Sequence, residues 1–94
     1  MPLTMKFIGA LRQISGKTQI TVNFQEGMKL KFLIAKISQE RPQLQKIFSD
    51  EQHNDSRSNA LVLVNGREIS VLDGLETQLN DGDEIVFIPV VHGG

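Results

Sequence analysis

The stretch TQITVNFQEGMKLKFLIAKISQE, residues 18–40, carries two hydrophobic periods in succession. Its first part alternates apolar and polar residues, with Ile20, Val22 and Phe24 on one side, which is typical of a half-buried strand. After the Glu-Gly pair that breaks this strand, apolar residues recur with the spacing of one helical face, at Leu30, Leu33, Ile34 and Ile37. The stretch therefore predicts a strand followed by an amphipathic helix over residues 28–40.

Four further strands are predicted around this stretch, one before it and three after it. They cover residues 4–9, 60–64, 67–71 and 84–88. Asn65-Gly66 joins two of them as a hairpin, because this dipeptide readily adopts the positive φ that a two-residue turn needs. The order strand, strand, helix, strand, short strand, strand predicts an α+β roll of the β-grasp kind. Its mixed sheet of four to five strands should carry the helix across one face and hold the last strand beside the first.

Periodicity also assigns the core. The side chains expected to face it are Met5, Phe7, Ile20, Val22, Phe24, Leu30, Leu33, Ile34, Ile37, Leu75, Leu79, Ile85 and Phe87. A helical turn over residues 10–15 should place Leu11 and Ile14 on its inner side. Pro42 ends the main helix, because the residue before a proline avoids the α region. A short turn after it should cap the core with Leu44, Ile47 and Phe48. Residues 49–59 contain no apolar side chain and predict an exposed loop.

Composition narrows the class of function. The 94 residues fit one domain over residues 1–88 and a tail over residues 89–94. A net charge of −1 without a basic block does not support nucleic-acid binding, and no apolar run approaches the ~20 residues of a membrane span. Without a signal-like N-terminus, we expect a cytoplasmic protein. The chain has no cysteine, two histidines and no motif for side-chain catalysis, so we expect a carrier rather than an enzyme and no bound metal.

The last six residues, PVVHGG, suggest where the chemistry lies. They could reach about 20 Å as extended chain. The glycines at positions 93 and 94 have no Cβ atoms that would obstruct entry into a narrow site. This pattern indicates that the reactive group is the terminal carboxyl of Gly94.

Three segments resemble the ubiquitin-like sulfur carriers and modifiers over essentially the whole chain. They are FIGALRQISG, LVLVNGREI and LNDGDEIVFIPVVHGG. This family includes the small subunit of molybdopterin synthase, the thiamine-pathway sulfur carrier, the ubiquitin-related modifier and the small archaeal modifier proteins. The molybdopterin-synthase type usually has two consecutive prolines before its tail, whereas here Val90 follows Pro89. The HGG ending looks more like the ubiquitin-related modifier.

The resemblance implies a chemistry for the tail. An E1-like enzyme would use ATP to adenylate the Gly94 carboxylate, so the chain itself would bind no cofactor. The product would become a thiocarboxylate, as a sulfur donor for molybdopterin or for tRNA thiolation, or would be joined to lysines of target proteins. The partners would be the activating enzyme and either a sulfur-accepting large subunit, a thiolation enzyme or the target proteins. A groove of the partner would recognise the rest of the tail: Pro89, Val90, Val91, His92 and Gly93. For His92 we favour this role over that of a catalytic base.

A second set of residues predicts a docking patch. Lys6 and Ile8 of the first strand should lie beside Val86 and Ile88 of the last, on the side away from the core. Single exposed hydrophobic residues are common, but a contiguous patch next to the tail is typical of a docking surface. The resemblance also places Ile8 and Ile88 at apolar interface positions of the molybdopterin-synthase small subunit. Two alternatives remain: a non-catalytic β-grasp interaction domain with an incidental tail, and a permanently bound small subunit of a molybdopterin-synthase-like complex.

Overall fold

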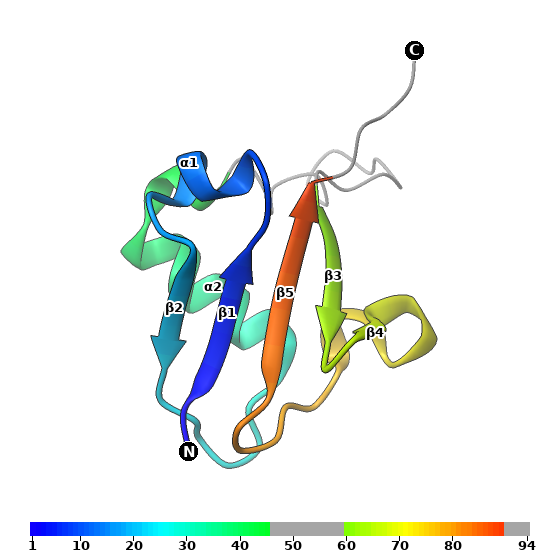
Figure 1. Cartoon of the computed structure of the whole chain (residues 1–94). Coiled ribbons are helices and arrows are strands. Elements are labelled where there is room, and N and C mark those ends of the chain that lie inside the picture. The colour runs from blue at the N-terminus through cyan, green and yellow to red at the C-terminus, as the bar shows by residue number, and fades with distance from the viewer. Residues whose placement is uncertain (46–59, 90–94) are drawn as a thin grey trace.

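A five-stranded mixed sheet with one long helix across a single face forms the architecture (Figure 1). The computed structural model describes residues 1–45 and 60–89. The strands are β1 (Leu3–Phe7), β2 (Gln19–Val22), β3 (Ala60–Val64), β4 (Arg67–Glu68) and β5 (Glu84–Pro89). The helices are α1 (Leu11–Ser15) and α2 (Leu30–Glu40), and the short 3-10 turns are η1 (Pro42–Leu44), η3 (Ile69–Val71) and η4 (Gly74–Glu76).

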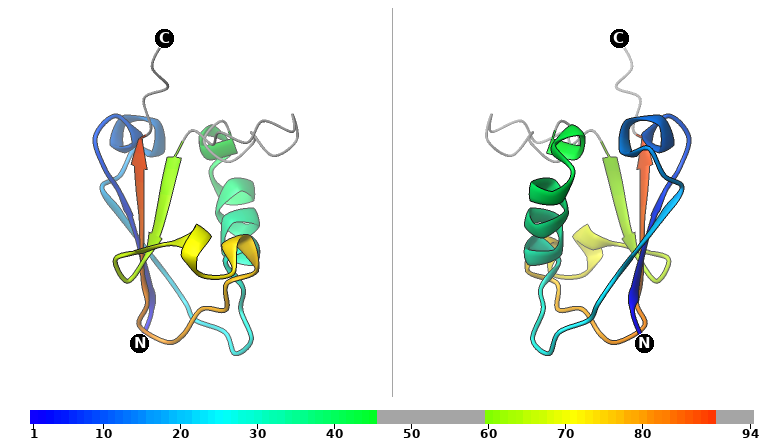
Figure 2. Two further views of the ribbon diagram at one scale, coloured as in Figure 1. Left: turned by 90° about the vertical axis from the view of Figure 1, so that its right-hand side faces the viewer. Right: turned by 90° about the vertical axis from the view of Figure 1, so that its left-hand side faces the viewer.

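The strand order, β2-β1-β5-β3-β4, confirms the β-grasp prediction. The last strand lies in the centre, parallel to β1 and antiparallel to β3. Figure 2 shows the sheet edge-on with α2 on one side of it. Because β1 and β5 are parallel, both strands start at one end of the sheet and finish at the other.

The core fills the space between the sheet and α2. Alternate residues of β1 and β5 point into it, and α2 contributes the side of its helix that the sequence predicted. The largest fully buried apolar side chains are Leu3, Met5, Phe7, Leu30, Leu33, Ile37, Leu44, Leu79, Ile85 and Phe87. Phe7 and Phe87 are paired in register on adjacent strands, and their rings stack with centroids 5.4 Å apart. This aromatic pair ties the two central strands together through the core.

The short helix α1 differs from its prediction in one respect. Leu11 is buried as expected, but Ile14 is 39% exposed and Ser15 is fully buried in its place. Ser15 lies four residues after Leu11, about one helical turn on, and so shares its face. Its hydroxyl donates to the carbonyl oxygen of Lys17 at 2.6 Å and accepts from the amide of Lys17 at 3.1 Å, which satisfies the buried polar group.

The predicted strand over residues 67–71 is also shorter than expected. β4 contains two residues and passes directly into η3. The side chain of Glu68 accepts a hydrogen bond from the amide of Ser70 at 3.0 Å. This bond caps the 3-10 turn, which competes with continuation of the strand. Ile47, Phe48 and the predicted loop over 49–59 lie outside the described residues.

The hairpin turn at Asn65-Gly66 holds β5 in place. Both residues have positive φ, 51° and 83°, as a type I′ turn requires. The side-chain amide of Asn65 donates to Asp83 Oδ1 at 2.7 Å, and its oxygen accepts from the amide of Glu84 at 2.9 Å. Asp83 is buried and also accepts from the amide of Asn80 at 2.7 Å. The turn therefore aligns the start of β5 with β3.

Candidate functional site

The last described residue, Pro89, marks the point where the tail begins. It lies opposite Ala60 of β3, so β5 extends one residue further than the sequence predicted. On its other side it meets the loop between β1 and α1. Gly9 in that loop has φ +59°, and a Cβ built on it would lie 3.3 Å from Pro89 Cγ. The amide of Ile8 donates to the carbonyl oxygen of Phe87 at 3.0 Å, which closes the contact between this loop and β5.

The remaining tail residues of the predicted site lie outside the described residues. They are Val90, Val91, His92, Gly93 and Gly94. The structure describes the part of the sheet to which these residues are attached. Pro89 ends the central strand, and its immediate surroundings are Gly9 and Ala60.

The predicted docking patch lies on the open face of the sheet, opposite α2. Ile85 and Phe87 are buried, so Val86 and Ile88 point the other way and are half-buried. Lys6 lies beside Val86 in register, and Ile8 is 37% exposed just beyond the end of β1. The structure therefore brings the four predicted residues to one face.

The patch is larger than the sequence indicated. Leu63 lies opposite Val86, and Leu61, which is 38% exposed, lies opposite Ile88. The apolar residues that together form this open-face patch are Ile8, Leu61, Leu63, Val86 and Ile88. The sequence analysis missed the two leucines, because ALVLV is a continuous apolar run whose two faces cannot be separated by hydropathy. The smaller side chains of Ala60, Val62 and Val64 face the core, and the two leucines face outward. This alternation in side-chain size could have separated the two faces.

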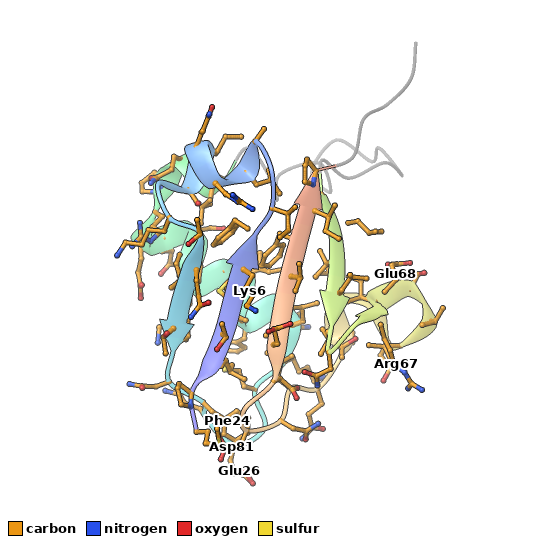
Figure 3. The ribbon with its side chains drawn as sticks, in the orientation of Figure 1. Lys6, Phe24, Glu26, Arg67, Glu68 and Asp81 are labelled. Carbon is orange, nitrogen blue, oxygen red and sulfur yellow. The ribbon has the colours of Figure 1, made fainter. Side chains whose placement is uncertain are left out.

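Lys6 forms one margin of the patch rather than part of its apolar surface. Its ammonium pairs with the carboxylate of Glu84 at 2.8 Å. Figure 3 shows Lys6 projecting from β1 over the open face, whereas Arg67 and Glu68 lie at the β4 edge. The patch thus has a charged border on the side away from the tail.

Two carboxyl groups have shifted pKa values, and neither suits general acid chemistry. Hydrogen bonds from Ser70 lower the pKa of Glu68. Lys31 and Lys29, whose ammonium groups lie 2.6 Å and 3.0 Å from the carboxylate, lower the pKa of Glu76. Both groups are therefore ionised near neutral pH. Within residues 1–45 and 60–89, no group of three or more His, Asp or Glu side chains is placed to hold a metal ion.

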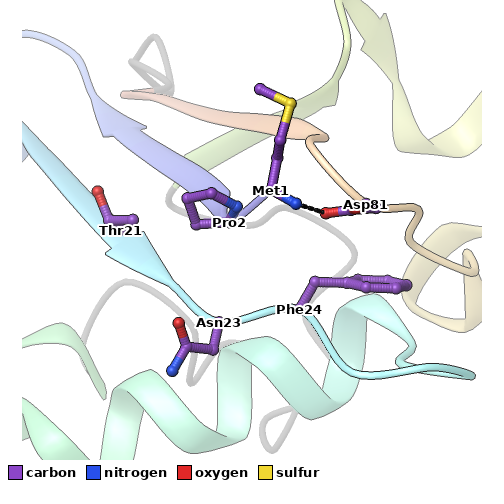
Figure 4. Close-up of a pocket in the computed structure, with 6 residues that line it drawn as sticks. All are labelled: Met1, Pro2, Thr21, Asn23, Phe24 and Asp81. Carbon is purple, nitrogen blue, oxygen red and sulfur yellow. Dashed lines mark ion pairs between the residues drawn. The ribbon is translucent and has the colours of Figure 1, made fainter.

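A pocket lies at the opposite end of the sheet from Pro89 (Figure 4). Its lining residues are Met1, Pro2, Thr21, Asn23, Phe24 and Asp81. The N-terminal ammonium pairs with Asp81 across it. Because β5 runs parallel to β1, this end is where both strands start and the tail site is where both finish. The pocket is therefore separate from the tail site.

A β-grasp roll whose central last strand leads into a di-glycine sequence defines the class of ubiquitin-like carriers and modifiers. The ThiS family model matches residues 5–94. The chain belongs to the ThiS family. Neither helix in the described part of the chain is long and apolar enough to cross a membrane.

Individual relatives agree with this assignment. Small archaeal modifier protein 3 of Haloferax volcanii is 28% identical over 94 residues, which is 100% of both chains. The solution structure of Urm1 from Trypanosoma brucei is similar with a TM-score of 0.79 and 27% identity, over 99% of this chain and 95% of that one. A chain of the complex of subunits 1 and 2 of the molybdopterin-converting factor from Helicobacter pylori has the same fold. Its TM-score is 0.62 and its identity 24%, with 100% of both chains covered.

Proposed function

We propose that the working group of this ubiquitin-like carrier is the terminal carboxylate of Gly94, activated by a separate E1-like enzyme. The observation that carries the proposal is the direct continuation of the central strand, next to an exposed apolar patch, into a tail that ends in two glycines. A rigid frame of this kind presents the tail at a defined distance from a docking surface. The chain itself would bind no cofactor, and the ATP would be bound by the activating enzyme.

The chemistry requires activation because a carboxylate is a poor electrophile. An oxygen of the Gly94 carboxylate attacks the α-phosphorus of ATP, and pyrophosphate leaves. A persulfide sulfur then attacks the carbonyl carbon of the acyl-adenylate and displaces AMP. A second thiol cleaves the resulting sulfur–sulfur bond, which leaves a thiocarboxylate on Gly94 and a disulfide on the donor. In the conjugation route, an enzyme thiol displaces AMP to form a thioester, and a lysine amine of a target protein displaces the thiol.

The glycines suit either route for a steric reason. The reacting carbonyl must enter an active site that excludes water, and a side chain at position 93 or 94 would add atoms there. The other tail residues, from Pro89 to His92, would occupy the approach to that site as extended chain. Because activation consumes ATP, we propose that the reaction takes place in the cytoplasm.

The open-face patch would hold the carrier on its partner during the reaction. Leu61 and Ile88 lie opposite each other near the end of the sheet from which the tail continues. Apolar contact there supplies affinity that does not depend on the tail. The tail could then move from one active site of the partner to another while the β-grasp domain stays bound.

The test is the intact mass of the protein isolated from its native cell. A gain equal to the difference between one sulfur and one oxygen atom, located on Gly94 by fragmentation, supports the sulfur-carrier route. A branched peptide in which the C-terminal segment of this chain is joined through Gly94 to a lysine of another protein supports conjugation. Because Arg67 is the last lysine or arginine of the chain, trypsin would leave residues 68–94 on that lysine. Gly94→Leu should abolish adenylation with its urea unfolding curve unchanged. Normal adenylation of this variant, or a natural product that continues past Gly94 without processing, would refute the proposal.

A second candidate function is a subunit that stays in a stable complex. The exposure of the open-face patch favours it, because such a surface is commonly covered in permanent assemblies. The related Helicobacter pylori protein is seen with its partner subunit. Co-purification of a larger subunit in equal amount from the native cell would support this version. Recovery of the free chain alone would favour a mobile carrier.

A further inference from the structure

Three basic residues surround Ser15 at one end of the molecule. Arg12 and Lys17 are exposed and flank Ser15 in the chain. Arg41 reaches it from the end of α2, where its Nη1 donates to the carbonyl oxygen of Ser15 at 3.4 Å. The hydroxyl of Ser15 is hydrogen-bonded to the backbone of Lys17. The buried Ser15 therefore connects the backbone segments that carry these basic residues. We call Arg12, Lys17 and Arg41 the basic rim.

The basic rim lies at the same end of the sheet as the root of the tail (Figure 1). The amide of Arg12 donates to the carbonyl oxygen of Gly9 at 3.0 Å. Gly9 in turn packs against Pro89, the last residue of β5. Figure 1 shows α1 at the same end of the sheet as the tip of β5. The backbone of Arg12 is thus one hydrogen bond away from the glycine that contacts Pro89.

The three basic residues of the rim gather at one end of the molecule without an acidic ion-pair partner among the described residues, whereas Lys36 and Arg67, which are also unpaired there, are single charges elsewhere. Among residues 1–45 and 60–89, the three rim cations form no ion pair, whereas Lys6, Lys29 and Lys31 are each paired with a glutamate. Glu40 precedes Arg41 in the chain, which leaves the rim with a net positive charge. Acidic residues lie at the far end, where Figure 3 shows Glu26 and Asp81. The rim is therefore locally positive, although the net charge of the sequence is −1.

We propose that the basic rim docks on an acidic surface at the entrance to the active site of the enzyme that activates the tail. This inference rests on the proposed activation of Gly94. A tail of a few residues can enter a catalytic site only if the surface around its root comes close to the enzyme. Cations there attract an acidic entrance, orient the approach and raise the association rate.

The alternative partner for a basic surface is RNA, and the surroundings of the rim favour a protein. Single-stranded nucleic acid is usually held by aromatic side chains interleaved with basic ones. Phe32, an aromatic side chain that is 69% exposed, lies in the first turn of α2, whereas Arg41 follows the last. Phe24 lies at the end of the molecule away from the rim (Figure 3). No aromatic side chain of the described residues thus accompanies the three cations.

The experiment compares two double variants with the same change of charge. R12Q/K17Q removes an arginine and a lysine from the rim, and K36Q/R67Q removes one of each elsewhere. None of these four residues forms an ion pair within the described ranges. Arg41 is left unchanged because it also bonds to Ser15. Adenylation by the E1-like enzyme of the same organism is followed by pyrophosphate exchange over a range of carrier and NaCl concentrations.

We expect R12Q/K17Q to lower kcat/KM at least about tenfold at low ionic strength, through KM and with kcat unchanged. The difference should shrink at high salt, where the Debye length falls to about 3 Å. K36Q/R67Q should stay within about twofold of the wild type. Equal losses in both variants, or normal kcat/KM in R12Q/K17Q, would overturn the inference. So would normal adenylation of R12Q/K17Q with lost binding to tRNA, which would assign the rim to RNA. If the wild-type chain is not adenylated at all, the proposed function itself fails.

Discussion

The contact between Gly9 and Pro89 can be isolated by comparing two glycines that have the same positive φ. Gly9 and Gly74 both have φ +59°, a value that side chains rarely adopt. A Cβ on Gly74 meets no heavy atom within 4 Å, whereas one on Gly9 lies 3.3 Å from Pro89 Cγ. Gly74→Ala therefore measures the backbone strain alone. Gly9→Ala measures the strain of the same φ together with the crowding against Pro89.

The magnitude follows from these two contributions. The left-handed conformation costs an alanine about 1–2 kcal/mol, offset by about 0.4–1 kcal/mol because the unfolded chain loses freedom. We therefore expect Gly74→Ala to lower the free energy of unfolding by about 1 kcal/mol. Carbon atoms prefer a separation of about 3.5–4.0 Å, so Gly9→Ala must displace Pro89 by a few tenths of an ångström. Crowding of this kind costs about 1 kcal/mol more.

Urea unfolding of both variants and of a double-mutant cycle provides the assay. The cycle adds Pro89→Ala, which removes the Cγ atom that the new methyl group meets. In this background the two glycine variants should become equally stable within about 0.5 kcal/mol. Adenylation by the activating enzyme should be slower for Gly9→Ala and unaffected in Gly74→Ala. Equal destabilisation of the two variants with Pro89 present would refute the argument that Gly9 is required by its neighbour.

Three further substitutions test the core, the surface charge and the open-face patch. Phe87→Ala should lower the free energy of unfolding by about 3–5 kcal/mol in urea, and a loss below about 1 kcal/mol would contradict the central place given to its ring. Lys31 and Lys29 lower the pKa of Glu76 in the folded state. The ionised Glu76 therefore raises the free energy of unfolding at pH values above its unfolded pKa, and this contribution is lost as the pH falls through its folded pKa. Glu76→Gln should therefore be less stable than the wild type at about pH 7, and the difference should shrink as the pH falls below the unfolded pKa of a glutamate, about 4.3. A difference that stays constant with pH would argue against the ion pairs. Leu61→Asp should weaken binding to the activating enzyme about tenfold or more in calorimetry. Phe32→Asp, which places the same charge on α2 at the other side of the sheet, should leave this binding unchanged. Equal effects of these two aspartates would remove the patch from the interface.

The elements whose burial follows from a clear period could be predicted from the sequence. The helical face of Leu30, Leu33 and Ile37 and the alternation around Ile85 and Phe87 both match the structure. The place of β5 beside β1 was also predicted, because the helical crossover leaves room there. Each of these predictions depends on the hydrophobic period within one helix or strand and on the packing of its apolar face against the rest of the domain.

The features that sequence reasoning missed depend on contacts between elements. Ser15 is polar, and its burial becomes favourable only once the backbone of Lys17 satisfies its hydroxyl. Leu61 could be assigned to a face only when its partner on β5 was known. The basic rim could not be seen at all, because Arg41 is distant in sequence from Arg12 and reaches Ser15 where η1, the turn that follows α2, packs against α1.

The parallel pairing of β1 with β5 connects the three parts of the proposed interface. It directs the ends of both strands to one end of the sheet, so that the loop after β1 meets the tail root at Pro89. The same pairing aligns Val86 with Lys6 and sets the open-face patch beneath that root. A partner that covers the patch therefore has the tail within reach at one border and the basic rim just beyond it. Residues of the folded domain can then bind the partner, while the terminal carboxylate reacts. The two glycines at the reacting end therefore need no side chains for recognition.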